Sequence, residues 1–160
     1  LAVLPNLKTV TVTGRTGPLS LRAFPHATAI TVIMDSTGTA ALRLTSELDS
    51  DNTALESLRI FGYEGGVQIG GYNSTVRDTA ALMQLSHCKA LRELRLNHCG
   101  LTDLAFASGL SNLEILDVSG NRIEDVSPLT GLTKLRLFLS ADNAIQNIAL
   151  LRGRDLVLSE

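Results

Sequence analysis

A 22-residue repeat is the feature that most constrains the fold of this chain. Three segments align, "LRELRLNHCGLTDL", "LEILDVSGNRIEDV" and "LRLFLSADNAIQNI", and they begin at Leu91, Leu113 and Leu135, so the interval between starts is the same both times (113 − 91 and 135 − 113). Each follows the pattern apolar-x-x-apolar-x-apolar-x-x-(Asn or Cys)-x-apolar-x-x-apolar, with Ser140 as the one exception. A fixed period of this length is typical of solenoids, in which each repeat forms one coil and stacked coils share a core.

Each coil is expected to contain one short strand whose side chains alternate between core and surface. In the second copy the strand covers residues 114–119, with Leu116 and Val118 facing inward. Ile115, Asp117 and Ser119 then face outward.

The asparagine of the repeat lies where the chain turns after the strand. The turn leaves backbone N–H and C=O groups in the interior, and an unpaired buried group costs about 1–3 kcal/mol. A carboxamide can satisfy both kinds of group, which accounts for Asn121 and Asn143 in apolar surroundings. Cys99 occupies the same slot one coil earlier, where a small thiol substitutes less completely.

These motifs resemble the leucine-rich repeat family, and "NRIEDVSPLTGLTKL" is similar to its 22-residue, internalin-type class. The resemblance is specific over residues 82–151 and degenerate before them. It implies an α/β leucine-rich repeat solenoid, with a curved parallel β-sheet on the concave face and turns, 3₁₀ pieces and short helices on the convex face. We predict that residues 1–160 form a single leucine-rich repeat domain and a fragment of a longer repeat array.

Further strands are predicted outside the three copies. They cover Leu7 to Val12, Ala27 to Val32, Leu55 to Ile60 and Arg154 to Leu158. The longer early coils leave room for convex-side helices over Thr39 to Leu48 and Ser74 to Cys88, whereas the later coils need only a 3₁₀ turn around "SPLTGL". Both ends lack an evident polar cap, which solenoids normally require. We therefore expect self-association through the ends, or a stack that continues beyond them.

Composition excludes several classes of function. The chain has 14 Lys and Arg against 16 Asp and Glu, so no global field gathers nucleic acid. The longest apolar run, Ala27 to Met34, is too short to span a bilayer, and no membrane insertion is expected. The absence of secretion-signal features in "LAVLPNLKTV" and the presence of only two cysteines favour an intracellular protein. The sequon at Asn73 would matter only in a secretory context.

No motif indicates an enzyme, a metal site or a cofactor. The glycine-rich stretch from Phe61 to Thr75 lacks the Gly-Lys-Ser/Thr of a phosphate loop, and we interpret it as a tolerated loop or as an insertion that contributes to a partner surface. The pairs His87-Cys88 and His98-Cys99 match no common zinc spacing. The repeat buries both thiols, and a buried thiol is inert.

The outward strand positions are the expected binding surface, because neighbouring coils repeat them about every 4.8 Å. Threonines prevail in the first coils, mixed charges in the middle and apolar side chains near the end. The first outward row is predicted to run Thr9, Ala29, Ser57, Glu93, Ile115, Leu137 and Asp155, and the middle row Thr11, Thr31, Arg59, Arg95, Asp117, Leu139 and Val157. The alternative to a binding role for the charges is a solvated face whose ion pairs contribute little.

Two interpretations of the apolar end stay open. Leu137 and Leu139 are exposed if the register holds, but Ser140 at a core position permits a one-residue bulge that would turn both leucines inward. Under the first interpretation, a protein partner of unknown identity binds the concave face at Arg59, Phe61, Glu93, Arg95, Ile115, Asp117, Leu137 and Leu139. The alternative function is an architectural segment of a larger assembly without a dedicated ligand, and fold analogy favours the binding module.

Overall fold

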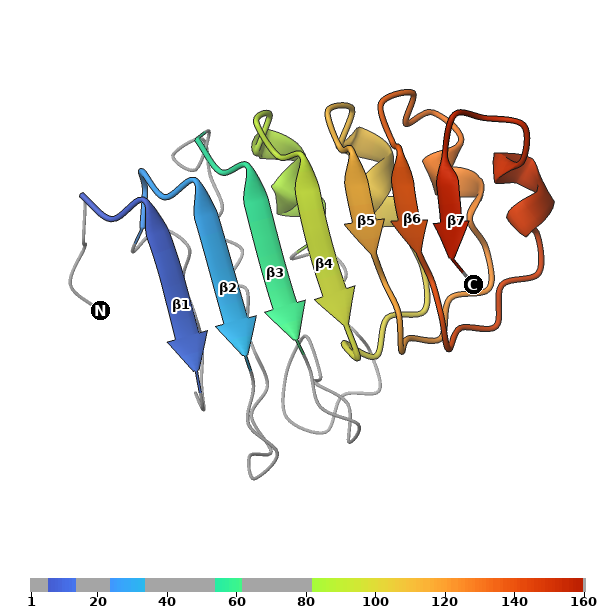
Figure 1. The fold of residues 1–160 in the computed structure, drawn as a ribbon, viewed down its shortest axis with the longest axis horizontal. Helices are drawn as coiled ribbons and strands as arrows, with labels where there is room; N and C mark the ends of the chain where they lie inside the picture. Colours follow the sequence, from blue (N-terminus) through green and yellow to red (C-terminus); the bar gives the residue numbers. More distant parts are fainter. Residues whose placement is uncertain (1–5, 14–23, 34–53, 62–81, 160) are drawn as a thin grey trace.

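The computed structural model describes residues 6–13, 24–33, 54–61 and 82–159. Within them, seven strands form one parallel sheet whose strand order is the order of the sequence. Figure 1 shows the strands side by side and pointing the same way. The strands are β1 (Thr9–Thr13), β2 (Ala29–Ile33), β3 (Ser57–Phe61), β4 (Glu93–Asn97), β5 (Ile115–Asp117), β6 (Leu137–Leu139) and β7 (Val157–Ser159). Each coil therefore contributes one strand beside that of the preceding coil, as the repeat predicts.

Short 3₁₀ helices connect the later strands. Those in the described residues are η3 (Gln84–His87), η4 (Ala105–Gly109), η5 (Ser127–Leu129) and η6 (Ile148–Leu151). The predicted turn around "SPLTGL" is confirmed as η5, which has proline in its first turn, where the missing N–H is tolerated. The predicted helix over Thr39 to Leu48 lies outside the described residues, and so do the glycine-rich stretch after Phe61 and the sequon at Asn73.

The core is a column of inward-facing side chains behind the sheet. One row crosses five adjacent strands in register, and all of its members are fully buried. This row consists of Ile30, Leu58, Leu94, Leu116 and Phe138. Burial of one such side chain stabilises the fold by about 1.5–3 kcal/mol. The opposite face of the sheet, which carries the outward positions and corresponds to the predicted concave face, is called the open face below.

Asn121 connects two coils through its carboxamide. Its Oδ1 accepts hydrogen bonds from the backbone N–H groups of Cys99 and Leu101, both at 3.0 Å. Its Nδ2 donates to the carbonyl oxygens of Leu96 at 2.7 Å and Val118 at 2.6 Å. The predicted role of this buried amide is therefore confirmed.

The same slot in the neighbouring coils follows the same rule. Asn143 donates to the Val118 carbonyl at 2.9 Å and accepts from the Ile123 N–H at 2.9 Å. Cys99 places its Sγ 3.3 Å from the Asn97 carbonyl. A thiol is a weak donor and a weak acceptor, so we expect Cys99→Asn to be tolerated or stabilising, which thermal melting would measure.

The residue before each slot has a left-handed backbone. The φ angles are 53° at His98, 72° at Gly120 and 56° at Asp142, at equivalent positions of three successive coils. Glycine adopts this conformation without steric cost. At Gly120 a second constraint applies, since an added Cβ would lie 2.3 Å from Nδ1 of the His98 ring.

Gly120→Ala is therefore expected to lower the free energy of unfolding by at least about 1–2 kcal/mol, the cost of a left-handed non-glycine residue. Displacement of the His98 ring adds to this cost. Chemical denaturation of Gly120→Ala, and of the same change combined with His98→Ala, would separate the two contributions. A Gly120→Ala protein as stable as the parent would contradict the left-handed turn.

The last coil is shorter than predicted. Val157 pairs with Leu137 and Ser159 with Leu139, so the placement of Asp155 and Val157 in those rows was wrong by two residues, and β7 begins at Val157 rather than Arg154. Equivalent positions on β6 and β7 are therefore closer together in the sequence (157 − 137) than those on β5 and β6 (137 − 115). The apolar alternation sets the register, because Leu158 comes opposite the buried Phe138.

Candidate protein-binding face

The structure decides between the two interpretations of β6. Leu137 and Leu139 are half-buried on the open face, whereas Phe138 and Ser140 are buried on the core side. The strand pairs with β5 and β7 without a bulge, so the bulge interpretation is wrong. Ser140 is tolerated in the core because its backbone N–H donates to the Ser159 carbonyl at 2.8 Å, with its hydroxyl 3.4 Å from the same oxygen.

Four outward side chains form an apolar patch, which consists of Ile115, Leu137, Leu139 and Val157. Ile115, Leu137 and Val157 lie in one row across β5, β6 and β7, and Leu139 lies beside Asp117 in the next row. Val157 is 63% exposed. The corrected register therefore moves Val157 from the row of Leu139 to the row of Leu137 and keeps it within the patch.

An ion cluster borders the patch on β3, β4 and β5. It consists of Arg59, Glu93, Arg95 and Asp117. Glu93 accepts from Arg59 Nη2 and from Arg95 Nε, each at 2.7 Å. Arg95 Nη1 also lies 3.3 Å from Asp117 Oδ2. Glu93 is paired in register with Ile115, so the cluster and the patch adjoin.

The acidic members of the cluster are not solvated. The side chains of Glu93 and Asp117 are 14% and 10% exposed, against 25% for Arg95 and 44% for Arg59. The alternative interpretation, in which the charges form only a solvated face, is therefore wrong for the two acids. A sequence pattern gives only their outward direction, whereas the structure also shows which side chains lie beside them: Arg59 and Arg95 beside Glu93, and Arg95 beside Asp117.

Three polar side chains that the binding prediction did not include complete the network. Asn97 Nδ2 donates to Asp117 Oδ1 at 2.7 Å, and Ser119 donates to the same oxygen through its hydroxyl at 2.8 Å. Ser57 Oγ donates to Glu93 Oε2 at 2.9 Å. Ser57 and Ser119 occupy predicted outward positions, and Asn97 ends β4 two residues after Arg95, on the same face of the strand. All three lie beside a carboxylate, and this adjacency is the signal by which they could have been found.

The network holds Glu93 in its ionised form. Partial burial by itself would raise the pKa of this carboxyl, but hydrogen bonds from the two arginines and from Ser57 outweigh it and lower the pKa to about 2. The folded pKa lies below the ordinary value of 4.5. Glu93 therefore contributes stability that is fully present above pH 4.5 and is lost as the pH falls from there through about 2.

The corresponding experiment is acid unfolding of the parent and Glu93→Gln. The parent should lose stability between about pH 4.5 and 2, and Glu93→Gln should lose less over that interval because it has no such proton to bind. Denaturant titrations at a series of pH values measure the difference. Equal pH dependence in the two proteins would contradict the role given to Glu93.

Phe61 does not belong to the patch or to the cluster. It is half-buried at the end of β3, beside Asn97 on β4 and Ile33 on β2. The open face therefore brings together seven of the eight residues predicted for binding, with Phe61 at its margin.

The two cysteines are buried and form no disulfide with each other. Burial raises the pKa of the Cys88 thiol to about 11, which keeps this thiol protonated and unreactive at neutral pH. No group of three or more His, Cys, Asp or Glu in the described part of the chain could hold a metal ion. Across the same residues, no helix is long and apolar enough to cross a membrane.

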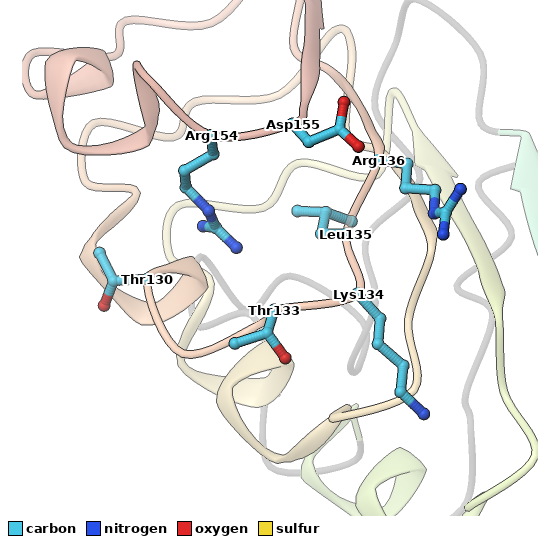
Figure 2. Close-up of a pocket in the computed structure, with 7 residues that line it drawn as sticks. All are labelled: Thr130, Thr133, Lys134, Leu135, Arg136, Arg154 and Asp155. Atoms are coloured by element: carbon cyan, nitrogen blue, oxygen red, sulfur yellow. The ribbon is translucent and has the colours of Figure 1, made fainter.

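A pocket of about 310 Å³ opens between the loops that lead into β6 and β7. Figure 2 shows the side chains around it, from Thr130, Thr133, Lys134, Leu135, Arg136, Arg154 and Asp155. Arg154 points into the hollow and donates to the carbonyl oxygens of Leu129, at 3.1 Å, and Leu132. Lys134 Nζ donates to Asn112 Oδ1 at 2.6 Å. Because the guanidinium of Arg154 connects the last coil to the preceding one, we interpret this pocket as a structural contact between coils.

A comparison with protein-family models found a match to one segment of the chain. The model of leucine-rich repeats, in two copies, matches residues 89–131. These residues are leucine-rich repeats. The matched segment covers β4, β5 and the asparagine slots of Cys99 and Asn121, which carried the resemblance in the sequence. A comparison with curated protein sequences found no match.

Solved structures show the same fold. Internalin InlF of Listeria monocytogenes is 17% identical with a TM-score of 0.54, over 88% of this chain and 42% of that one. Internalin C2 of the same organism is 19% identical with a TM-score of 0.54, over 91% of this chain and 66% of that one. The chain thus spans less than two thirds of each internalin. The fold is a leucine-rich repeat solenoid, which is typically a non-enzymatic fold.

Proposed function

We propose that this chain is a protein-interaction module that binds a protein partner through the open face of its sheet. Leucine-rich repeat domains fit such a role in general. The observation that carries the proposal is the apolar patch, whose four side chains face away from the core on three adjacent strands. Contiguous apolar surface on the outside of a protein marks interaction sites, and an apolar centre with polar or charged side chains at its border is typical of partner surfaces.

The edge of the sheet supports the second candidate, an architectural segment that stacks with further coils or copies. Ile145 and Ile148 in the last described coil are only partly buried, whereas Ile123 and Val126, at the equivalent positions one coil earlier, are fully buried. No described strand pairs with the outer side of β7. Unpaired strand edges associate readily, so measuring the molecular mass of the purified chain over a range of concentrations tests this candidate.

A capture experiment with matched variants tests the binding role. The parent, Leu139→Glu and Leu150→Glu are immobilised in parallel and exposed to the same cell extract. Leu150 is a matched control because it is 51% exposed and lies in η6, away from the open face. We expect a protein that the parent and Leu150→Glu retain and that Leu139→Glu loses. Equal capture by all three would place the partner elsewhere and contradict the proposal.

A further inference from the structure

We infer that the protein partner presents a carboxylate side chain to Arg59 and Arg95. Next to this carboxylate, the partner places apolar side chains against the apolar patch. This inference rests on the proposed binding role of the open face and adds the partner's chemistry to it. It follows from an account of the donors and acceptors in the ion cluster.

The oxygens of Glu93 are occupied within the chain. Oε1 accepts from Arg95 Nε at 2.7 Å. Oε2 accepts from Arg59 Nη2 at 2.7 Å and from Ser57 Oγ at 2.9 Å. With 14% of the side chain exposed, this carboxylate offers little to a partner.

The oxygens of Asp117 are occupied in the same way. Oδ1 accepts from Asn97 Nδ2 and from both the backbone N–H and the hydroxyl of Ser119. Oδ2 accepts from Arg95 Nη1 at 3.3 Å. The acceptor that has no hydrogen bond, Asn97 Oδ1, is itself enclosed, so it is not available to a partner.

The arginines of the cluster, in contrast, have N–H donors for which the described residues supply no acceptor. A guanidinium carries five N–H groups. Among the described residues, Arg59 uses only Nη2 and Arg95 uses only Nε and Nη1. The side chain of Arg59 is also the most exposed of the four, at 44%. The cluster is formally neutral, but it buries its negative charge and turns donors and positive charge outward.

A carboxylate is the protein group that matches such a surface. Its two oxygens fit the fork of a guanidinium, and charge-assisted hydrogen bonds of this kind are about twice as strong as neutral ones. Arg95 on β4 and Leu137 on β6 are two strands apart, which is about 10 Å at the usual strand spacing. An acidic residue about three positions from an apolar one in an extended segment would bridge that span.

A library of random dodecapeptides displayed on phage provides the probe. Selection on the immobilised chain should enrich peptides that combine Asp or Glu with apolar residues. For a selected peptide made synthetically, changing its acid to Asn or Gln should weaken binding about tenfold. The ratio of the two peptides' dissociation constants, neutral peptide over acidic peptide, should fall to about one on Arg59→Gln. It should stay near ten on Arg152→Gln, an exposed control on the loop after η6. Arg59→Lys, which keeps the charge, should restore part of it.

The outcomes separate this inference from the proposed function. Peptides that Leu139→Glu fails to bind, but whose acid makes no difference to affinity or makes the same difference on folded Arg59→Gln, would overturn the inference and leave the proposed binding face standing. Peptides that bind Leu139→Glu as well as the parent would overturn the proposed face itself. Melting curves of the variants, recorded before binding, confirm that each is folded.

Discussion

Replacing Asn121 with alanine is expected to lower the free energy of unfolding by about 3 kcal/mol. The side chain lies in the core of the solenoid, and its amide bonds to backbone groups of two coils. These groups are the N–H of Cys99 and Leu101 and the carbonyl oxygens of Leu96, Val118 and Ser119. Alanine would leave them without the partner, and each buried group that stays unsatisfied costs about 1–3 kcal/mol. Water entering the vacated space would satisfy some of these groups, which limits the total to about 3 kcal/mol.

Asn112→Ala is the matched control for this prediction. Asn112 also bonds to both neighbouring coils, donating to the Lys89 carbonyl at 2.8 Å and accepting from Lys134 Nζ at 2.6 Å, but at an exposed site. Water can replace both bonds, so their loss should cost less than about 1 kcal/mol. Urea denaturation of the parent and both variants gives the comparison. Equal stability changes in the two variants would contradict the buried role of Asn121.

Replacing Leu139 with glutamate is expected to weaken partner binding by about 2 kcal/mol or more. The change places a charge in the centre of the proposed interface, beside the buried Asp117 carboxylate on β5. The melting temperature should fall only slightly, because the side chain faces away from the core and glutamate can extend into solvent, which limits its repulsion with Asp117. Affinity is measured by calorimetry with the captured partner, and stability by thermal melting.

For Phe138, the residue before Leu139, we expect the opposite: a large loss of stability on substitution. Phe138 is fully buried on the core side of the same strand, so Phe138→Ala should cost about 3–5 kcal/mol of stability. If Leu139→Glu unfolds the chain as strongly as Phe138→Ala does, the facing of β6 is wrong. If Leu139→Glu binds the partner as tightly as the parent, the patch is not the interface.

The repeat sufficed to predict the solenoid because its constraints are local. Leucine spacing sets which side chains face inward, and the asparagine slot follows from the need to satisfy the backbone of each turn. The facing of Leu137 and Leu139 came from the same period. The alternation alone could not exclude a bulge at Ser140. The register in which β6 pairs with β7 excludes it.

The features that the sequence did not predict depend on contacts between coils. Asp117 is hydrogen-bonded by Arg95 and Asn97 from the preceding coil and by Ser119 from its own. A periodic pattern does not predict which side chains reach across to the next strand. The register of the last coil was mispredicted for a different reason, since this coil is two residues shorter than each of the two before it. The composition of this coil does not indicate that it is shorter. The shortening is recognised only from the register, in which Leu158 lies opposite Phe138.

The central claim, that the apolar patch is a binding surface, is tested most directly by methyl NMR of the chain with the captured partner. Ile, Leu and Val methyl groups are labelled, and the partner is added stepwise. The resonances of Ile115, Leu137, Leu139 and Val157 are predicted to shift or broaden in proportion to the bound fraction, while Leu150 in η6 stays unchanged. Perturbation of Leu150 with the four patch residues unchanged would contradict the claim.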